Sequence, residues 1–166
     1  MMASERLRRS GRPILVHAAR TAVAALISVL VARLFRLPQY YWAPITTLVI
    51  TQSSLGATLA VCWQRFVGTA LGAVVGAMAA SYFGSDLLVF AASVFILGLV
   101  SGLLRSDQAA YRFGSLTVAI VILVPRTEPA WRMAFHRFAE VTIGIVVALV
   151  LTVSWPDKVA APTGQR

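Results

Sequence analysis

Residues 65–80 read RFVGTALGAVVGAMAA, a stretch with small side chains at every fourth position. Gly68, Gly72, Gly76 and Ala80 therefore share one face of a helix, because residues four apart are neighbours on a helical surface. In a membrane, where lipid is as apolar as the side chains, such small residues let two helix backbones approach closely. The stretch thus predicts an intramembrane helix whose glycines serve helix packing.

The beginning of this stretch is echoed later in the chain. The Arg-Phe pair at 65–66 is followed after five residues by Gly72, and the Arg-Phe pair at 137–138 is followed after five residues by Gly144. The offset of 72 residues also lays the first apolar segment over the fourth, with Arg33 on Arg105, and the second over the fifth. Since an odd number of crossings makes the second unit enter from the opposite side, we expect two inverted three-helix repeats, as in many transporters.

Composition extends the membrane prediction to the whole chain. Of the 166 residues, 58% are hydrophobic and 13% are charged, against about 25% charged in an average soluble domain. The sequence therefore predicts an all-α polytopic membrane protein of about six transmembrane helices, in one membrane domain at 14–156. We expect a basic cytoplasmic segment at 1–13 and a short cytoplasmic tail at 157–166.

Six apolar segments are the expected helices: Ile14–Phe35, Tyr41–Ser54, Phe66–Phe83, Leu87–Leu104, Tyr111–Val124 and Phe138–Trp155. A helix needs about 20 apolar residues to cross the bilayer, so the second and fifth are short. Each is expected to tilt little or to extend into an interfacial stretch such as Leu55–Trp63, which leaves five or six spans open. The first segment follows several arginines, but it is too long for a signal peptide and contains Arg20.

Lysine and arginine indicate the orientation. With a cytoplasmic N-terminus, ten of the 15 basic residues fall on the inner side and five on the outer side. Basic residues favour the cytoplasmic face, so both termini are expected inside. The net charge of +9 then reflects contact with anionic membrane lipid. Binding to nucleic acid is disfavoured, because the basic residues form no stripe interleaved with aromatic side chains.

Three arginines are candidates for a substrate pathway. Arg65 and Arg137 hold matching positions in the two repeats, at the inner end of the third helix and the outer end of the sixth, where they would guard two mouths of one pathway. The alternative is that each reaches to lipid headgroups. Arg20 lies two turns inside the first helix, where a charge usually faces a bundle interior or a wet cavity.

The second segment adds a stripe of hydroxyl groups. Thr47, Thr51 and Ser54 follow the spacing i, i+4, i+7 and share one helix face, and Thr46 and Gln52 add further polar atoms. Such a stripe suits a pathway for hydrated or carboxylate-bearing anions. The alternative is that the hydroxyls bond back to their own helix backbone.

Glu140 is the one acid inside a predicted helix, three residues after Arg137 and four after His136. It either pairs with one of these neighbours, or it forms a proton-coupling pair with His136, because imidazole titrates near neutral pH and intramembrane carboxylates mark proton relays.

Motifs for enzymatic chemistry are missing from the sequence. It contains no nucleophile elbow, no HExxH and no phosphate-binding loop. Cys62 is the only cysteine, which excludes an intramolecular disulfide and a cysteine-based zinc site. The two histidines lie far apart, so we expect no metal, no cofactor and no enzyme.

The stretch from Tyr41 to Gly72 resembles the fusaric acid resistance and aromatic acid exporter family. It contains a tryptophan at Trp42, a Gln-Ser-Ser-Leu-Gly run at 52–56 and an Arg-x-x-Gly-Thr-x-x-Gly box at 65–72. Arg137-Phe138, Gly144 and Trp155-Pro156 are similar to that family's last helix, so the likeness spans most of the chain.

The resemblance implies a six-helix membrane domain, distantly similar to plant aluminium-activated malate transporters, in which two subunits enclose an anion pathway lined by basic residues. It implies export of aromatic or other organic carboxylates across a bacterial inner membrane, with Arg65 facing the pathway and Arg137 as its counterpart. Longer members carry a cytoplasmic domain and often a second membrane half, which favours a homodimer here. The alternative function is a non-transporting assembly or envelope-integrity protein.

Overall fold

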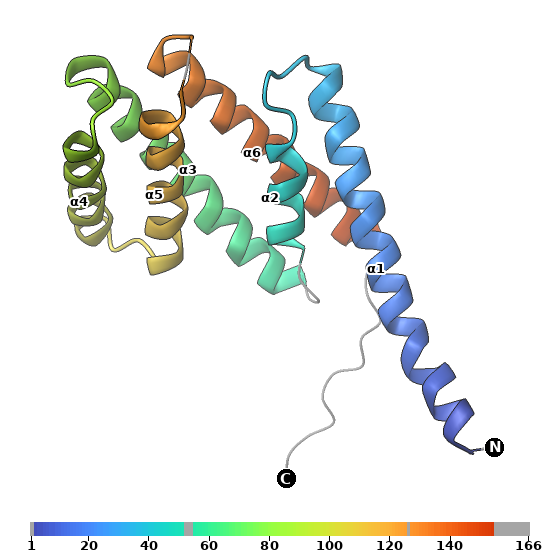
Figure 1. Ribbon diagram of the computed structural model, residues 1–166. Helices are drawn as coiled ribbons and strands as arrows, with labels where there is room; N and C mark the ends of the chain where they lie inside the picture. The colour runs from blue at the N-terminus through green and yellow to red at the C-terminus, as the bar shows by residue number, and fades with distance from the viewer. Residues whose placement is uncertain (1, 52–54, 126, 155–166) are drawn as a thin grey trace.

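The computed structural model describes residues 2–51, 55–125 and 127–154, which fold into six α-helices without a strand (Figure 1). The helices are α1 (Met2–Leu34), α2 (Trp42–Ile50), α3 (Leu55–Tyr82), α4 (Leu87–Leu103), α5 (Gln108–Leu123) and α6 (Ala130–Ser154). The predicted all-α fold is confirmed.

The six helices differ in their ability to cross a bilayer. In the described part of the chain, three segments are long and apolar enough to do so, namely Leu15–Leu34 of α1, α3 and α6. With 17 and 16 residues, α4 and α5 extend about 25 Å at 1.5 Å per residue, against a core of about 30 Å. With nine residues, α2 extends about 14 Å. The chain is a polytopic membrane protein in which α2 by itself is too short to span.

The surface also suits a lipid environment. Large apolar side chains are exposed along the outer faces of the helices, among them Leu26 and Leu30 of α1, Phe95 of α4 and Val150 of α6. Apolar surface on this scale is rare on soluble monomers and marks contact with a partner or a membrane. These exposed apolar faces are suited to contact with acyl chains or with apolar partner helices.

Several helices begin earlier than the sequence predicted. The first begins at Met2, α3 begins at Leu55 and α6 begins at Ala130. Leu55–Trp63 therefore belongs to α3 and does not extend α2. Arg65 and Arg137 lie about three and two turns inside their helices, and not at helix ends as predicted, because the turns before them, which the apolar pattern alone did not mark, are also helical.

Contacts between helices pair off between the two halves of the chain. α1 packs on α2 as α4 packs on α5, and α3 packs on α5 as α6 packs on α2. α1 touches α6 as α4 touches α3, while α3 and α6 pack on each other. In Figure 1, α1 to α3 run up, down and up, whereas α4 to α6 run down, up and down. This pattern is the one that two inverted units would produce, and the inverted repeat stays a prediction.

Both halves end their first helix with the same turn. Arg36 and Arg105 lie two residues beyond the ends of α1 and α4, at φ of 53° and 49°. In each turn the next backbone N–H donates to the carbonyl five residues back, at 3.2 Å and 2.9 Å, which closes a helix at a left-handed residue. The spatial counterpart of Arg105 is thus Arg36, three residues from the Arg33 that the 72-residue shift selects.

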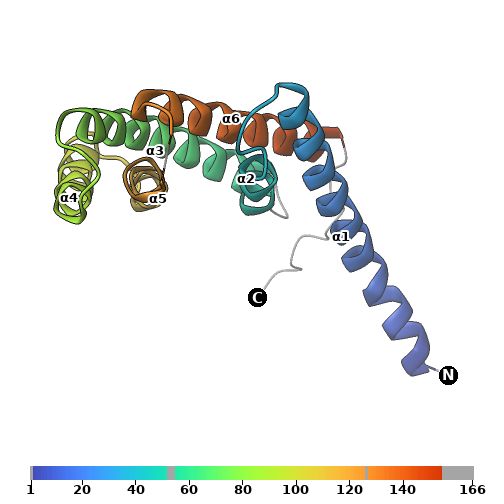
Figure 2. The ribbon, with the colours of Figure 1, turned by 45° about the horizontal axis from the view of Figure 1, so that its top comes forward.

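Two apolar clusters fill the interior. One joins α3, α4, α5 and the start of α6, and the other joins α2, α3 and α6. Ile122 belongs to the first and Ile50 to the second; they are one 72-residue shift apart, and both are fully buried. Each middle helix therefore anchors one cluster. In Figure 2, α3 and α6 lie along one side of the molecule, with α2 and α5 beneath them.

Candidate functional site

Glycines bring the backbones of α3 and α5 close together. A side chain at Gly68 would collide with the carbonyl oxygen of Ala110, and one at Gly72 with that of Gly114. Gly76 has more room, since an added Cβ would lie 3.3 Å from its nearest neighbour. The predicted ladder of small residues therefore lies where α3 meets α5, a middle helix from the other half of the chain.

Gly144 of α6 plays the corresponding part for α2. An added Cβ there would lie 2.6 Å from the Ala43 carbonyl oxygen and 2.6 Å from the Cβ of Thr46. Thr46 is fully buried, and its hydroxyl accepts hydrogen bonds from Nη2 and Nε of Arg65 at 3.1 Å and 3.3 Å. Gly144 thus makes room for Thr46, and Thr46 in turn fixes the guanidinium of Arg65.

The two arginines stack on aromatic rings in a reciprocal manner. Arg65 lies 4.8 Å from the ring centroid of Phe113 on α5, and Arg137 lies 4.1 Å from that of Trp42 on α2. Each arginine therefore uses the middle helix of the other half, in a contact that favours a desolvated cation. Only 3% of Arg65 and 1% of Arg137 are exposed, so neither guanidinium reaches out toward lipid headgroups.

The halves meet at a pair of matching residues. The rings of Phe66 and Phe138, one 72-residue shift apart, lie 5.2 Å apart at 55°. Equivalent residues contact each other where a two-fold relation brings a surface against its own copy. Arg65 and Arg137 directly precede these rings, and their guanidinium groups are close enough to repel each other. The predicted guards of two separate mouths are thus neighbours in one interior site.

Glu140 is the acid at this site. It is fully buried, and its Oε2 lies 3.3 Å from Nη1 of Arg137. The backbone of Gln39 contributes a hydrogen bond to the same carboxylate. Within the described residues, Oε1 of Glu140 and Nε of Arg137 have no hydrogen-bond partner. The ion pair of Glu140 is thus with Arg137, and a buried charge without full compensation is costly.

The hydroxyl stripe of α2 is used inside the protein. The Thr47 hydroxyl lies within hydrogen-bonding distance of the Ser28 hydroxyl and of the Ala43 and Gly144 carbonyls, at 3.0, 3.1 and 3.2 Å. Thr51 donates to the carbonyl of Thr47 at 2.7 Å, a bond to its own helix. The other two stripe candidates, Gln52 and Ser54, lie outside the described residues.

Arg20 is buried on α1, with 2% exposed. It begins a row of buried positions four residues apart that continues through Ala24, Ser28 and Ala32. Because Ser28 reaches Thr47, this face of α1 packs on α2. Ala24, Ser28 and Ala32 form a second ladder of small residues. Sequence reasoning missed this ladder, although its spacing is visible in the sequence.

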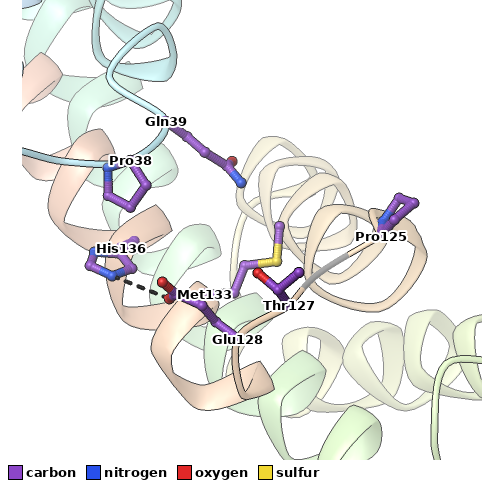
Figure 3. A pocket seen from close by; sticks show the side chains of 7 residues that line it. All are labelled: Pro38, Gln39, Pro125, Thr127, Glu128, Met133 and His136. Atoms are coloured by element: carbon purple, nitrogen blue, oxygen red, sulfur yellow. Dashed lines mark ion pairs between the residues drawn. The ribbon is translucent and has the colours of Figure 1, made fainter.

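His136 lies at a pocket of about 170 Å³ between the turn after α1 and the turn before α6 (Figure 3). Its Nε2 is 3.8 Å from Oε2 of Glu128, so the structure gives His136 and Glu140 different partners. Proton coupling between them stays a prediction. Gln39 also lines the pocket, and its side chain accepts a hydrogen bond from Trp42 at 3.1 Å. The pocket and the arginine site therefore share a wall.

Two of the aromatic partners were missed by sequence reasoning. It named Trp42 as part of the family resemblance and gave no role to Phe113, because an aromatic ring in an apolar segment carries no signal of the cation that stacks on it. The same reasoning offered no metal site, and among the described residues no three His, Cys, Asp or Glu side chains gather.

The helices and the buried arginine pair define the class of protein, a polytopic helical membrane protein with a charged interior site. The chain belongs to the fusaric acid resistance protein-like family, whose model matches residues 24–151. The family resemblance seen in the sequence is therefore confirmed.

Three relatives illustrate how far the similarity extends. The inner membrane protein YeeA of Escherichia coli (strain K12) is 28% identical over 150 residues, which cover 87% of this chain and 42% of the relative. The aluminum-activated malate transporter 10 of Arabidopsis thaliana is 27% identical over 124 residues, covering 68% and 25%. An uncharacterized protein of Haemophilus influenzae is 24% identical over 149 residues, covering 87% and 20%. The chain thus spans less than half the length of each.

Proposed function

We propose that this chain forms the membrane part of a transporter or channel for organic anions, and that it is not an enzyme. The observation that carries the proposal is the pair of neighbouring buried guanidinium groups, Arg65 and Arg137, of which Arg137 forms an ion pair with Glu140. In a low-dielectric interior such a pair attracts a further anion, because the anion balances charge that the protein leaves unbalanced.

The residues around the arginines favour an aromatic carboxylate. A guanidinium binds a carboxylate through two parallel hydrogen bonds. Trp42 and Phe113 lie under the two guanidinium groups, and Phe66 and Phe138 meet beside them. An aromatic acid would direct its carboxylate to an arginine and its ring to these side chains, where offset or edge contacts between rings are favourable.

The relatives support the membrane setting of the proposal. One is named as an inner membrane protein of a bacterium and another as a malate transporter. We propose that this chain resides in a bacterial inner membrane with both ends in the cytoplasm, and that it exports its substrate. We further propose that two copies assemble into a homodimer, as the family resemblance implies.

Anion flux through liposomes tests the proposal. The pure protein is reconstituted, and efflux of labelled benzoate and labelled malate is measured for the native chain, Arg65→Ala and Arg137→Ala. We expect each substitution to lower flux at least about tenfold, which corresponds to about 1.4 kcal/mol of lost interaction. The matched control is Arg132→Ala, which removes an exposed arginine of α6 that stacks on Trp131 and should leave flux unchanged.

Two results would contradict the proposal. Native protein that moves neither acid would favour the non-transporting role, in which the chain serves assembly or envelope integrity. Flux that survives both Arg65→Ala and Arg137→Ala would show that the anion takes a path away from this site.

A further inference from the structure

We propose that Glu140 is a resident carboxylate that occupies Arg137 when no substrate is bound, so that Glu140 and the substrate anion compete for the same guanidinium. This inference rests on the proposed function and deepens it, because it assigns the site a resting state and an internal competitor.

The ion pair between Glu140 and Arg137 is only half made. A complete pair of guanidinium and carboxylate has two parallel hydrogen bonds of about 2.8 Å. Here a single contact of 3.3 Å joins Oε2 to Nη1. Nε of Arg137 and Oε1 of Glu140 stay without a partner among the residues that the structure describes, although both side chains are almost wholly buried. The site therefore holds a donor that its own acid does not satisfy.

Helix geometry explains why the pair stays incomplete. Glu140 and Arg137 are separated by three residues on α6, so both side chains leave the same face one turn apart. The guanidinium also stacks on the ring of Trp42, with Cζ 4.1 Å from the ring centroid. Glu140 contacts one nitrogen, Nη1. A free carboxylate is not bound to that backbone and can face Nε and an Nη nitrogen together.

The surrounding charges favour exchange of one anion for another. Arg65 is close enough to repel Arg137, so an anion that enters near both gains attraction from two guanidinium groups. Nε and Nη2 of Arg65 donate to the Thr46 hydroxyl. Nε of Arg137, by contrast, has no hydrogen-bond partner among the described residues. We therefore expect competition at Arg137, and the positive charge of Arg65 adds to the attraction for the anion.

A purely electrostatic role of Glu140 makes a different prediction. If Glu140 acted only through its negative charge, Glu140→Gln would tighten anion binding, whereas Glu140→Asp, which keeps the charge, would not. If Glu140 competes with substrate for Arg137, both substitutions should tighten anion binding, because both remove the carboxylate from contact with Nη1 of Arg137. Tighter binding by Glu140→Gln alone would therefore overturn the competition.

The test measures benzoate affinity by benzoate-dependent thermal stabilisation of purified protein in detergent. We expect Glu140→Gln to bind benzoate at least about tenfold more tightly than the native chain. The matched control is Glu128→Gln, which removes the same charge from the acid beside His136 and should change affinity less than about twofold. Equal or weaker binding by Glu140→Gln, or an equal gain in Glu128→Gln, would overturn the proposal.

A second variant is needed in case the Glu140→Gln protein does not fold. Glu140→Asp shortens the side chain by one methylene group and withdraws the carboxylate from Arg137, so it should also tighten benzoate binding. Variants that fold only when benzoate is added support the proposal, because the anion then replaces the resident acid. Variants that stay unfolded in saturating benzoate contradict it.

Failure of this inference is distinct from failure of the proposed function. Native protein that neither binds nor moves benzoate and malate, whatever residue stands at 137, would contradict the function itself. Flux that depends on Arg137, together with no tighter binding in Glu140→Gln and Glu140→Asp, would remove only the competing role of Glu140.

Discussion

Thr47 is the side chain that joins two helices of the first half, α1 and α2, to the last helix of the second half, α6. Its hydroxyl lies near Ser28 of α1, its own α2 backbone and the Gly144 carbonyl of α6. Thr51, one turn further on, donates to the carbonyl of Thr47 and has no other side-chain hydrogen bond among the described residues. Two hydroxyl groups that look equivalent in the sequence therefore contribute differently to contacts between helices.

Replacing Thr47 with valine should destabilise the fold more than the same change at Thr51. Valine keeps the shape but removes the hydroxyl, and it leaves the Ser28 hydroxyl short of a buried partner. We expect a loss of about 1–3 kcal/mol for Thr47→Val and less than about 1 kcal/mol for Thr51→Val. Thermal unfolding in detergent measures both. Equal losses would mean that the contacts with α1 and α6 contribute nothing.

At this scale, the sequence predicted the charged residues but not their partners. Arg65 and Arg137 could be identified because the repeat marks them. Their aromatic and hydroxyl partners depend on how α2 and α5 cross the long helices, which periodicity within one segment does not specify. Sequence spacing offered Glu140 both Arg137 and His136 as neighbours, and only the side-chain geometry assigns it to Arg137.

The short helix α2 depends on a glycine in another helix. Its residues Ala43 and Thr46 lie directly over Gly144, and Thr46 holds the guanidinium of Arg65. The position of an arginine in α3 is therefore set by the absence of a side chain in α6, through a helix of only nine residues.

Gly144→Ala should damage both stability and transport. The added methyl group would press on the backbone of α2 and on Thr46, which costs about 1–3 kcal/mol or more in a packed interior. Displacement of Thr46 would release Arg65, so benzoate flux should also fall. Gly102→Ala is the control, because nothing lies within 4 Å of its added Cβ and alanine is the better helix former. A tolerated Gly144→Ala would contradict this account of α2.

Helix boundaries mark the limit of sequence reasoning for the elements. Six helices and their order could be predicted from apolar segments, but the starts of α3 and α6 could not. Trp63, Gln64 and Arg65 interrupt the apolar pattern, yet they continue the helix, because their polar atoms find partners: Gln64 donates to Asp107 at 2.9 Å and Arg65 to Thr46. Tertiary contacts thus extend a helix beyond its own pattern.

For the whole molecule, the alternation of helix direction determines which turns share a side. In Figure 1 the turn between α3 and α4 lies at the opposite end from the turn between α4 and α5. Arg105 and Arg112 flank the second turn, whereas the first carries no basic residue. The second turn should therefore face the cytoplasm.

Labelling of single cysteines tests this orientation. In a Cys62→Ala background, Ser106→Cys should react with a membrane-impermeant thiol reagent only from the cytoplasmic side, and Ser85→Cys only from the opposite side. Cysteines at the two ends of the chain should react from the same side as Ser106→Cys. Labelling of both turns from one side would rule out the crossing of α4 and the inverted halves with it.

The inverted duplication is the large-scale prediction from the sequence, and it stays a prediction with which the helix contacts agree. A short motif and an odd number of helices per unit were sufficient to expect two opposed halves, and the helix contacts pair off accordingly. The exact register could not be predicted, because the turns at Arg36 and Arg105 match at a slightly different offset. Turn geometry, and not residue identity, aligns the two halves there.

The net charge of the buried groups on α3 and α6 affects which ionic charge a bound solute can have. Arg65 and Arg137 together carry two positive charges, and Glu140 carries one negative charge. One singly ionised acid makes this centre electrically neutral, whereas a doubly ionised acid leaves an excess negative charge in a medium that solvates ions poorly. For the proposed transporter, we therefore expect singly ionised acids to be preferred over doubly ionised ones.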